Sequence, residues 1–264
     1  MLRINKLTFT YGNKLIFDQL SLNIRNNKMT LFLAPNNSGK TTLIYLLSGL
    51  LPSNNCIKNY KYYLNQKDGK NYVKTIGVVF NNLDKQFITS SVIEELSLPL
   101  VNLGFRKDKI IEIVEDQIKF FAIDFENKSI DKLTNLEKLT LLLAVATIHR
   151  PKILLLDDIF NNINPCDFEY LSKILKKITT LRHVAIFMTS SNIHHALYFD
   201  YVFLYNKKVV MEAPLEKMLE KENILRKEGI KVPDLIKTCV ILKDYDLIKD
   251  FVYNERTLVD RLWG

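Results

Sequence analysis

The chain has 264 residues, of which 47% are hydrophobic, and a formal net charge of +8. That length allows one large domain, or a domain with a small appendage, and the apolar content suffices for a sizeable core. No apolar run approaches the roughly 20 residues of a membrane-spanning helix, and segment 1–10 alternates like a strand and lacks the apolar core of a signal peptide. Cys56, Cys166 and Cys239 are far apart and odd in number, so we expect no zinc or disulfide framework, which suits a reducing cytoplasm.

The positive charge comes mostly from lysines scattered along the chain, often beside asparagine. The simplest interpretation is a solvated surface. An anionic membrane surface or a nucleic acid is the alternative partner. No arginine-rich run or interleaved aromatic stripe supports nucleic acid, and we expect none to bind.

The N-terminal part of the chain predicts strands. Segments 2–10 and 15–24 alternate as strands do, and Gly12-Asn13 supplies a turn between them. Segment 29–33, which reads MTLFL, is a further strand, and it leads directly into a candidate ligand loop.

That loop, residues 34–42, reads APNNSGKTT and precedes the helix-like segment 43–47. In a strand–loop–helix of this kind, backbone N–H groups and the helix N-terminus hold phosphate oxygens. Lys40 would reach the terminal phosphates and the Thr41 hydroxyl would bind Mg²⁺, whereas Ala34 stands where the usual pattern has Gly. The alternative is a chance Gly-Lys-Thr at a helix start. The candidate nucleotide-binding residues here are Ala34, Pro35, Asn36, Asn37, Ser38, Gly39, Lys40, Thr41 and Thr42.

The rest of the chain alternates helices with strands. Helical spacing or long apolar runs predict helices over 89–103, 108–122, 136–148 and 167–180, and the chain from Pro214 onward is mainly helical. Short apolar runs predict strands over 76–80, 153–156 and 183–189, with a hairpin over 201–210.

This order predicts an α/β fold with a mixed sheet core, an antiparallel β subdomain and a helical subdomain. Strands that alternate with helices imply a mostly parallel sheet with the ligand at the carboxyl ends of the strands. We expect one domain over 1–212, with a helical insertion over about 82–150, and a C-terminal helical extension over 213–264.

The layout resembles P-loop ATPases of the ABC type over nearly the whole chain. Two stretches resemble, more narrowly, the ATPases of energy-coupling factor (ECF) transporters. Residues 76–87, IGVVFNNLDKQF, look like the Q-loop of that family and its following run. Residues 224–233, ILRKEGIKVP, look like the start of its C-terminal extension.

The resemblance implies ATP and Mg²⁺ as ligands and gives some residues roles. Tyr11 would stack on adenine, although a turn tyrosine packed on the first strands is the alternative. Asp157 would hold the Mg²⁺ shell together with Thr41 and Asn81.

Catalytic positions depart from the family pattern. Asp158 stands in place of Glu, Asn81 in place of the Q-loop Gln, and Ser190 in place of the switch His. A shift of about one ångström can cost on the order of a hundredfold in rate. The nearby pair His194-His195 is better interpreted as a polar helix surface than as a metal or switch site.

The signature loop departs furthest. The family pattern Leu-Ser-Gly-Gly-Gln is here Leu133 followed by Thr134, Asn135, Leu136 and Glu137. In the family this loop caps the nucleotide held by the opposite subunit, and its glycines allow close approach. As a local structure, Thr134 and Glu137 instead predict a capping box at an ordinary helix start.

These features together imply the ATP-binding subunit of an ECF-type importer of vitamins or metal ions. The expected partners are a second ABC ATPase subunit, in a heterodimer, and a multi-span membrane subunit, which places the chain peripherally at the cytoplasmic face of the membrane. The adjacent acids Glu94 and Glu95 would face the membrane subunit, unless they serve only as first-turn helix acids. A pseudo-ATPase that binds ATP without hydrolysing it is the second interpretation, and a soluble nucleic-acid-linked ABC protein is the third.

Overall fold

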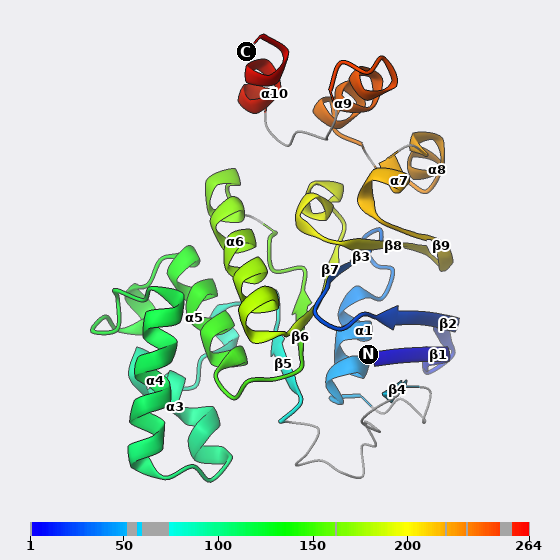
Figure 1. The fold of residues 1–264 in the computed structure, drawn as a ribbon. Coiled ribbons are helices and arrows are strands. Elements are labelled where there is room, and N and C mark those ends of the chain that lie inside the picture. The colour runs from blue at the N-terminus through cyan, green and yellow to red at the C-terminus, as the bar shows by residue number, and fades with distance from the viewer. Residues whose placement is uncertain are drawn as a thin grey trace.

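The centre of the molecule is a six-stranded sheet with the order β5-β6-β7-β3-β8-β9 (Figure 1). The computed structural model describes residues 2–51, 57–59, 74–161, 163–219, 221–230, 232–248 and 255–263. The strands are β3 (Met29–Leu33), β5 (Ile76–Val79), β6 (Ile153–Asp157), β7 (Ala185–Ser190), β8 (Tyr201–Asn206) and β9 (Lys208–Ala213). The first five pair in parallel, and β9 pairs antiparallel with β8. Because β3, β6 and β7 are buried along their whole length, their near-continuous apolar sequences fit a parallel sheet covered on both faces.

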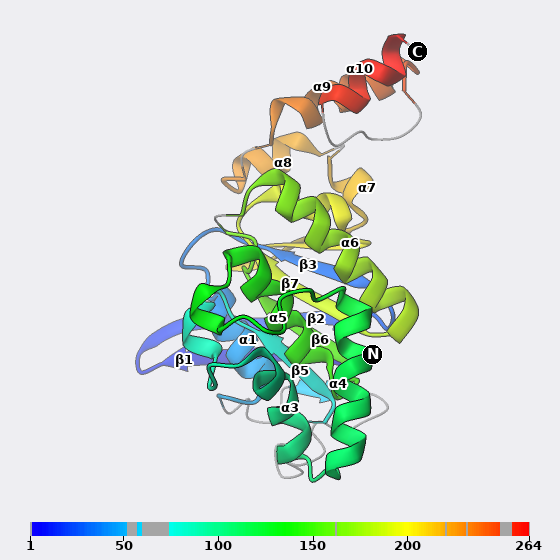
Figure 2. The ribbon, with the colours of Figure 1, turned by 90° about the vertical axis from the view of Figure 1, so that its left-hand side faces the viewer.

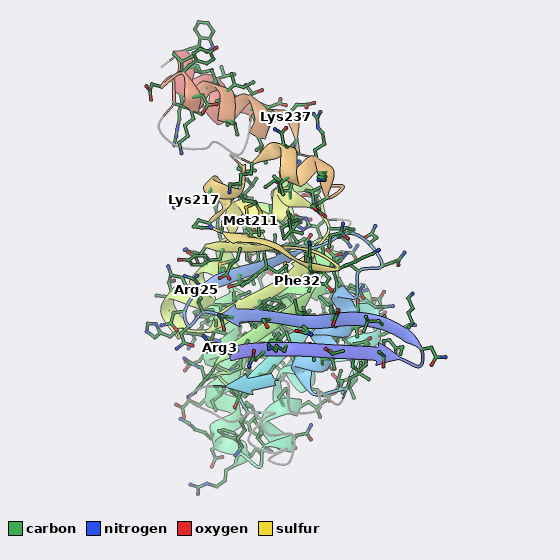
Figure 3. The ribbon with its side chains drawn as sticks, turned by 90° about the vertical axis from the view of Figure 1, so that its right-hand side faces the viewer. Arg3, Arg25, Phe32, Met211, Lys217 and Lys237 are labelled. Carbon is green, nitrogen blue, oxygen red and sulfur yellow. The ribbon has the colours of Figure 1, made fainter. Side chains whose placement is uncertain are left out.

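A second, antiparallel sheet lies beside the first and has the order β2-β1-β4 (Figure 3). Its strands are β1 (Leu2–Tyr11), β2 (Lys14–Ile24) and β4 (Ile57–Asn59). Helix α1 (Lys40–Ser48) and both sheets share one hydrophobic cluster, in which Phe32 of β3 lies near Phe187 and Tyr205. The phosphate loop therefore has the central sheet on one side and, on the other, the antiparallel sheet β2-β1-β4, which we call the arm.

Helices α3 (Val92–Asn102), α4 (Lys107–Phe121) and α5 (Asn135–Thr147) follow β5 and pack on one another. The apolar side chains Val92, Leu96 and Leu100 of α3 are fully buried, as their helical spacing predicts. A buried Gln117 on α4 donates to the Ala144 carbonyl at 2.6 Å and so ties α4 to α5. In Figure 2, α3 and α4 lie at the opposite end of the molecule from the last two C-terminal helices.

The C-terminal part consists of α7 (Leu215–Leu219), α8 (Glu222–Lys227), α9 (Asp234–Asp244) and α10 (Glu255–Trp263), which extend beyond β9 (Figure 1). The predicted helical character of this part is confirmed where the structure describes it. Within the described ranges, none of the helices is long and apolar enough to cross a membrane.

The predicted elements are confirmed, and their ends differ for local reasons. Helix α3 begins at Val92, later than predicted, because Ser91 is its N-cap and accepts from the Glu94 N–H. Helix α6 (Pro165–Arg182) ends at His183, whose left-handed conformation (φ 55°) delays β7 until Ala185.

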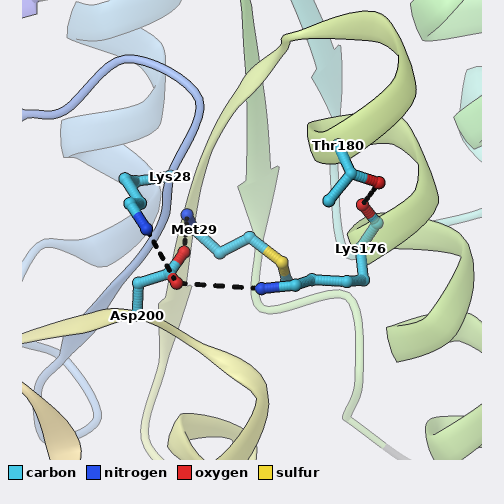
Figure 4. Close-up of polar contacts among 5 residues, drawn as sticks. All are labelled: Lys28, Met29, Lys176, Thr180 and Asp200. Carbon is cyan, nitrogen blue, oxygen red and sulfur yellow. Dashed lines mark hydrogen bonds and ion pairs between the residues drawn. The ribbon is translucent and has the colours of Figure 1, made fainter.

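Asp200 connects three elements at the amino end of β3 (Figure 4). Its carboxylate accepts the Met29 N–H at 2.8 Å, and it lies 3.5 Å from the Lys28 ammonium and 3.7 Å from that of Lys176 on α6. The turn before β8 is thereby joined to the start of β3 and to the helix that covers it.

Candidate nucleotide-binding site

The phosphate loop joins β3 to α1 and turns through two left-handed residues, Asn37 (φ 61°) and Gly39 (φ 94°). A Cβ built on Gly39 would lie 2.6 Å from Cγ2 of Ile16 and 3.0 Å from Cζ of Phe17, both on β2. Glycine is therefore required at position 39 for two reasons, the backbone conformation and the close approach of the arm.

The Lys40 ammonium lies inside this loop. Its side chain is on the first turn of α1, the residue is only 8% exposed, and Nζ donates to the carbonyls of Ala34 at 3.2 Å and Pro35 at 3.1 Å. Burial lowers the pKa of Lys40, and the carboxylates of Asp158 and Asp157 act in the opposite direction. A buried cation held by carbonyl oxygens in a loop of this shape is a site for an anion, because a phosphate group would replace weak neutral acceptors with charged ones.

Asp157 ends β6 next to the loop and is fully buried. Its carboxylate accepts hydrogen bonds from the hydroxyls of Thr41 at 2.9 Å and Thr189 at 3.0 Å. Burial raises the pKa of Asp157, and the hydrogen bonds from the two threonines lower it. Thr41 and Asp157 thus present hydroxyl and carboxylate oxygens side by side, which is the ligand chemistry that Mg²⁺ prefers.

Asp158 follows in a left-handed conformation (φ 49°) and is almost fully buried. Burial raises the pKa of this carboxyl, the Lys40 ammonium lowers it, and the side chains of Asn161 and Ser190 also lower it. Its Oδ1 has no hydrogen-bond partner within the described residues. A buried acceptor without a partner costs free energy, so a donor from a ligand or water at that atom would stabilise the site.

Asn81 lies at the same edge of the sheet as Asp157, because β5 pairs in register with β6 and residue 81 follows two positions after β5 ends. Its side chain is exposed. Gln86 holds the backbone on both sides of it: Gln86 accepts the Phe80 N–H and donates to the carbonyls of Phe80 and Asn82, all at 2.8–2.9 Å. Sequence reasoning missed this role of Gln86, for which a long amide five residues beyond Asn81 was the available signal.

Ser190 is fully buried where β7 ends between β3 and β6. The backbone N–H of Ala34 donates to its carbonyl at 2.9 Å, which links the phosphate loop to β7. The interpretation of His194-His195 as a polar surface is wrong for His195, whose Nδ1 lies 2.7 Å from Ser190 Oγ while the residue is 6% exposed. The cause is the short 3-10 helix Ile193–Tyr198, which turns His194 outward and His195 inward.

The signature region forms the capping box that its sequence predicts. Thr134 accepts the Glu137 N–H at 3.2 Å, and Glu137 accepts the Thr134 N–H at 2.8 Å. The Lys128 ammonium lies 2.6 Å from the other Glu137 oxygen, and this pairing holds the pKa of Glu137 below its usual value. The Glu137 charge is therefore partly neutralised, Asn135 is exposed, and Leu136 packs against the core.

Tyr11 and Glu95 are the remaining residues for which the sequence predicted a functional role. The Tyr11 ring is 46% exposed at the tip of the arm and packs edge-on against Phe9 at 5.0 Å. The prediction that Glu95 faces a partner is wrong: it is 3% exposed and accepts from the backbone N–H groups of Ile88 and Thr89 at 3.1 and 2.8 Å. The neighbouring acid, Glu94, is exposed.

A family model described as ABC transporter matches residues 17–161, which is more than half of the chain. The chain belongs to the ABC transporter family. The matched span contains residues 34–42, Asn81, residues 133–137 and the Asp157-Asp158 pair, and by family the chain is an ABC-type ATPase.

Named relatives agree with that family. The energy-coupling factor transporter ATP-binding protein EcfA of Pediococcus pentosaceus is 26% identical over 229 residues, which cover 84% of this chain and 82% of the relative. EcfA1 of Fusobacterium nucleatum is 29% identical over 192 residues, which cover 72% and 73%.

Solved structures share the fold. The structure of cbiO1 from Clostridium perfringens, described as part of the ABC transporter complex cbiONQ, has a TM-score of 0.78 at 22% identity and covers 90% of this chain and 97% of its own. The ATP-binding cassette MJ0796, described as a dimer bound to ADP and Pi in a post-hydrolysis state, has a TM-score of 0.70 at 18% identity and covers 81% and 99%. At these identities the likeness concerns the fold alone.

The residues of this ABC ATPase fit both ligands that the family uses. For the nucleotide, the loop offers the buried Lys40 ammonium and a buried Ser38 hydroxyl that has no hydrogen-bond partner among the described residues. For Mg²⁺, it offers the oxygens of Thr41 and Asp157. Bound Mg²⁺ would neutralise charge on the phosphate oxygens, and Lys40 would contribute a fixed positive charge beside it.

Proposed function

We propose that this chain is the ATP-binding subunit of an ECF-type transporter. The observation that carries the proposal is the buried Lys40 ammonium inside the loop, beside the Thr41–Asp157 pair. That arrangement supports binding of Mg·ATP, with Tyr11 stacking on the adenine and the residues of the 34–42 loop surrounding the phosphates. The similarity to EcfA proteins supports the transporter type. Uptake of a vitamin or a metal ion belongs to the proposal because residues 76–87 and 224–233 resemble ECF ATPases.

Titration with a fluorescent ATP analogue tests the binding site. Wild-type protein should bind saturably, and Lys40→Ala should lose most of that binding because a charge-assisted contact disappears. Lys28→Ala is the matched control, since Lys28 is exposed and its ammonium lies 3.5 Å from Asp200, at the other end of β3 from the loop. Equal binding by wild type and Lys40→Ala would contradict the assigned role of Lys40.

A groove supports docking of a membrane subunit. A pocket of about 860 Å³ opens between β5, α3 and α5, and its walls are mostly apolar, with Leu98, Pro99 and Val145 among them. Ile88 lies at this groove with 77% of its surface exposed, next to the loop that carries Asn81. A helix of the membrane subunit seated here would contact the segment that leads to the bound nucleotide.

Co-purification with the membrane subunit tests the groove. Ile88→Glu should abolish assembly because it places a charge in the apolar contact, while ATP binding persists. Ile111→Glu, an exposed apolar residue on α4 outside the groove, is the control. Normal assembly of Ile88→Glu would mean that the membrane subunit docks elsewhere.

We also propose that the chain pairs with a second ATPase subunit in a heterodimer and that it hydrolyses ATP weakly. Support for weak hydrolysis comes from the catalytic positions, where Asp158, Asn81 and Ser190 are all shorter than the residues the family uses. The signature residues Thr134, Asn135, Leu136 and Glu137 lack glycine, so contact with the partner's nucleotide would be impaired as well. These departures also favour the pseudo-ATPase interpretation as the second candidate.

A further inference from the structure

The segment that carries Asn81 leaves the central sheet at its edge. Among the described residues, β5 pairs with β6 alone, so one side of its backbone has no strand beside it. The pairing of Val79 with Leu156 puts Phe80, the next residue, level with Asp157. The N–H and C=O groups of a residue at such an edge need other partners.

The side-chain amide of Gln86 takes the place of a neighbouring strand at Phe80. Its oxygen accepts the Phe80 N–H at 2.8 Å, and its nitrogen donates to the carbonyls of Phe80 at 2.8 Å and Asn82 at 2.9 Å. A carboxamide has one acceptor oxygen and two N–H hydrogens, so these three groups use both of its hydrogens and decide its orientation. Methionine and ionised glutamate, which are of similar length, offer no donor, and lysine offers no acceptor. The position therefore requires glutamine.

These hydrogen bonds fix the backbone on both sides of Asn81, whose own side chain is exposed. The 3-10 turn that carries Gln86 is itself attached to the helical subdomain, because the Asp84 carboxylate in this turn lies 2.7 Å from the Lys138 ammonium on α5. The Lys138 side chain is only 14% exposed, so the turn is held on a side chain that is largely buried. The direction in which Asn81 leaves the backbone therefore depends on Gln86.

We propose that Gln86 is a positioning residue, which holds Asn81 so that its amide oxygen is available to Mg²⁺ together with Thr41 and Asp157. This inference rests on the proposed function, because it takes Asn81 as a residue that holds Mg²⁺. Asparagine has one methylene fewer than the glutamine of the family, so its oxygen reaches less far and tolerates less movement of the backbone. The Gln86 side chain bonds backbone groups of residues 80 and 82, and it acts on Mg²⁺ only through Asn81.

Amide hydrogen exchange, measured by NMR on the chain without nucleotide, tests whether Gln86 holds the loop. Gln86→Met keeps the length of the side chain and removes its hydrogen bonds, so the Phe80 amide should exchange on the order of tenfold faster. Lys85→Ala, at an exposed residue of the same turn, is the matched control and should leave that rate unchanged. Equal exchange rates for wild type and Gln86→Met would overturn the proposal, whether or not the protein binds ATP.

Titration with a fluorescent ATP analogue, in Mg²⁺ and in EDTA, tests the consequence for Asn81. In Mg²⁺, Gln86→Met should weaken binding on the order of tenfold, as is usual when a residue that orients a metal ligand is lost. In EDTA it should bind like wild type, which also shows that the variant is folded. In an Asn81→Ala background, Gln86→Met should have no further effect.

Two results of this titration would overturn the proposal. Equal weakening in Mg²⁺ and in EDTA would mean that Gln86 supports the fold and not the metal site. Equal weakening with and without the Asn81 side chain would mean that Gln86 acts independently of it. A wild-type chain that binds no ATP in either medium would instead contradict the proposed function, and the exchange of the Phe80 amide would still decide whether Gln86 holds the loop.

Discussion

At the scale of single residues, the site depends on backbone conformations that only certain side chains tolerate. Gly39 and Asp158 are both left-handed, and they lie in the loop after β3 and directly after β6. The Gly-Lys-Thr pattern predicts the glycine from sequence. Nothing in the sequence predicts the conformation of Asp158, which depends on the way that residues 157–161 turn away from the sheet.

Gly39→Ala should disable the loop. The new methyl group would meet Ile16 at 2.6 Å in a backbone region that alanine disfavours. We expect a loss of unfolding free energy of about 1–3 kcal/mol together with loss of ATP binding. Gly104→Ala is the control, because Gly104 has φ +79° but no atom within 4 Å of a built Cβ. Urea denaturation and ATP titration of both variants would measure this, and equal losses would show that the contact with the arm is unimportant.

Protonation of His195 should make stability depend on pH. The folded state binds this proton only near pH 4, whereas the unfolded state binds it near pH 6.5. Between these values the unfolded state holds more protons, so stability should fall by about 3 kcal/mol as the pH decreases from 6.5 to 4. The raised pKa values of Asp157 and Asp158 act oppositely in this window, and the lowered pKa of His194 acts in the same direction.

The measurement is therefore a comparison of urea denaturation for wild type and His195→Leu at several pH values. The difference between the two proteins isolates residue 195, because the other groups are common to both. A constant difference from pH 7 to pH 4 would contradict the assignment of this histidine as buried and neutral.

At the scale of elements, sequence periodicity predicted the strands and helices, whereas the strand order of the sheets comes from the structure. The 3.6-residue period located α3 and its buried face of Val92, Leu96 and Leu100. The same period places Glu95 on that face, one turn after Val92, so its burial could have been predicted. The charge of Glu95 favoured the prediction of an exposed position. In the structure its carboxylate instead accepts hydrogen bonds from the loop at residues 88–89.

Glu95→Ala should therefore destabilise the segment between the Q-loop and α3. Its carboxylate receives two backbone N–H groups and the Thr89 hydroxyl, which would be left without an acceptor. We expect a loss of about 2–3 kcal/mol, measured by urea denaturation, and faster amide exchange at Thr89. Glu94→Ala should change stability by less than about 0.5 kcal/mol, as is usual for an exposed residue. Similar losses for both variants would contradict the buried role of Glu95.

At the scale of the whole molecule, the family and the nucleotide loop could be predicted because short motifs fall in order at suitable spacing. The side-chain contacts in the loops beside those motifs were not predicted. Gln86, Glu95 and His195 form hydrogen bonds with atoms only four to seven positions away in the chain. The fold of these short loops decides which groups meet, and the spacing of apolar residues does not report it.

Hydrolysis by the chain alone should be slow, with a turnover below about 1 s⁻¹ measured by phosphate release. Water positioning and proton transfer each typically supply about 10²–10⁴-fold, and several contributors are shortened together. The double variant Asp158→Glu and Ser190→His should raise turnover only when the partner subunit has a signature that contains glycine. His195 already lies 2.7 Å from Oγ of residue 190, so the new imidazole also requires His195→Ala to fit. Fast turnover by the isolated wild-type chain would contradict this prediction.

The central position of β3 has a consequence for the order in which the protein is made. Both neighbours of this strand, β7 and β8, come from residues 185–206, although β3 itself ends at Leu33. During synthesis the strand that leads into the phosphate loop leaves the ribosome early and must wait for them. At about 5–20 residues per second, the wait is about 10–30 seconds. For that time two apolar strand edges stand open, and the nascent chain depends on chaperones or on its early arm to avoid aggregation.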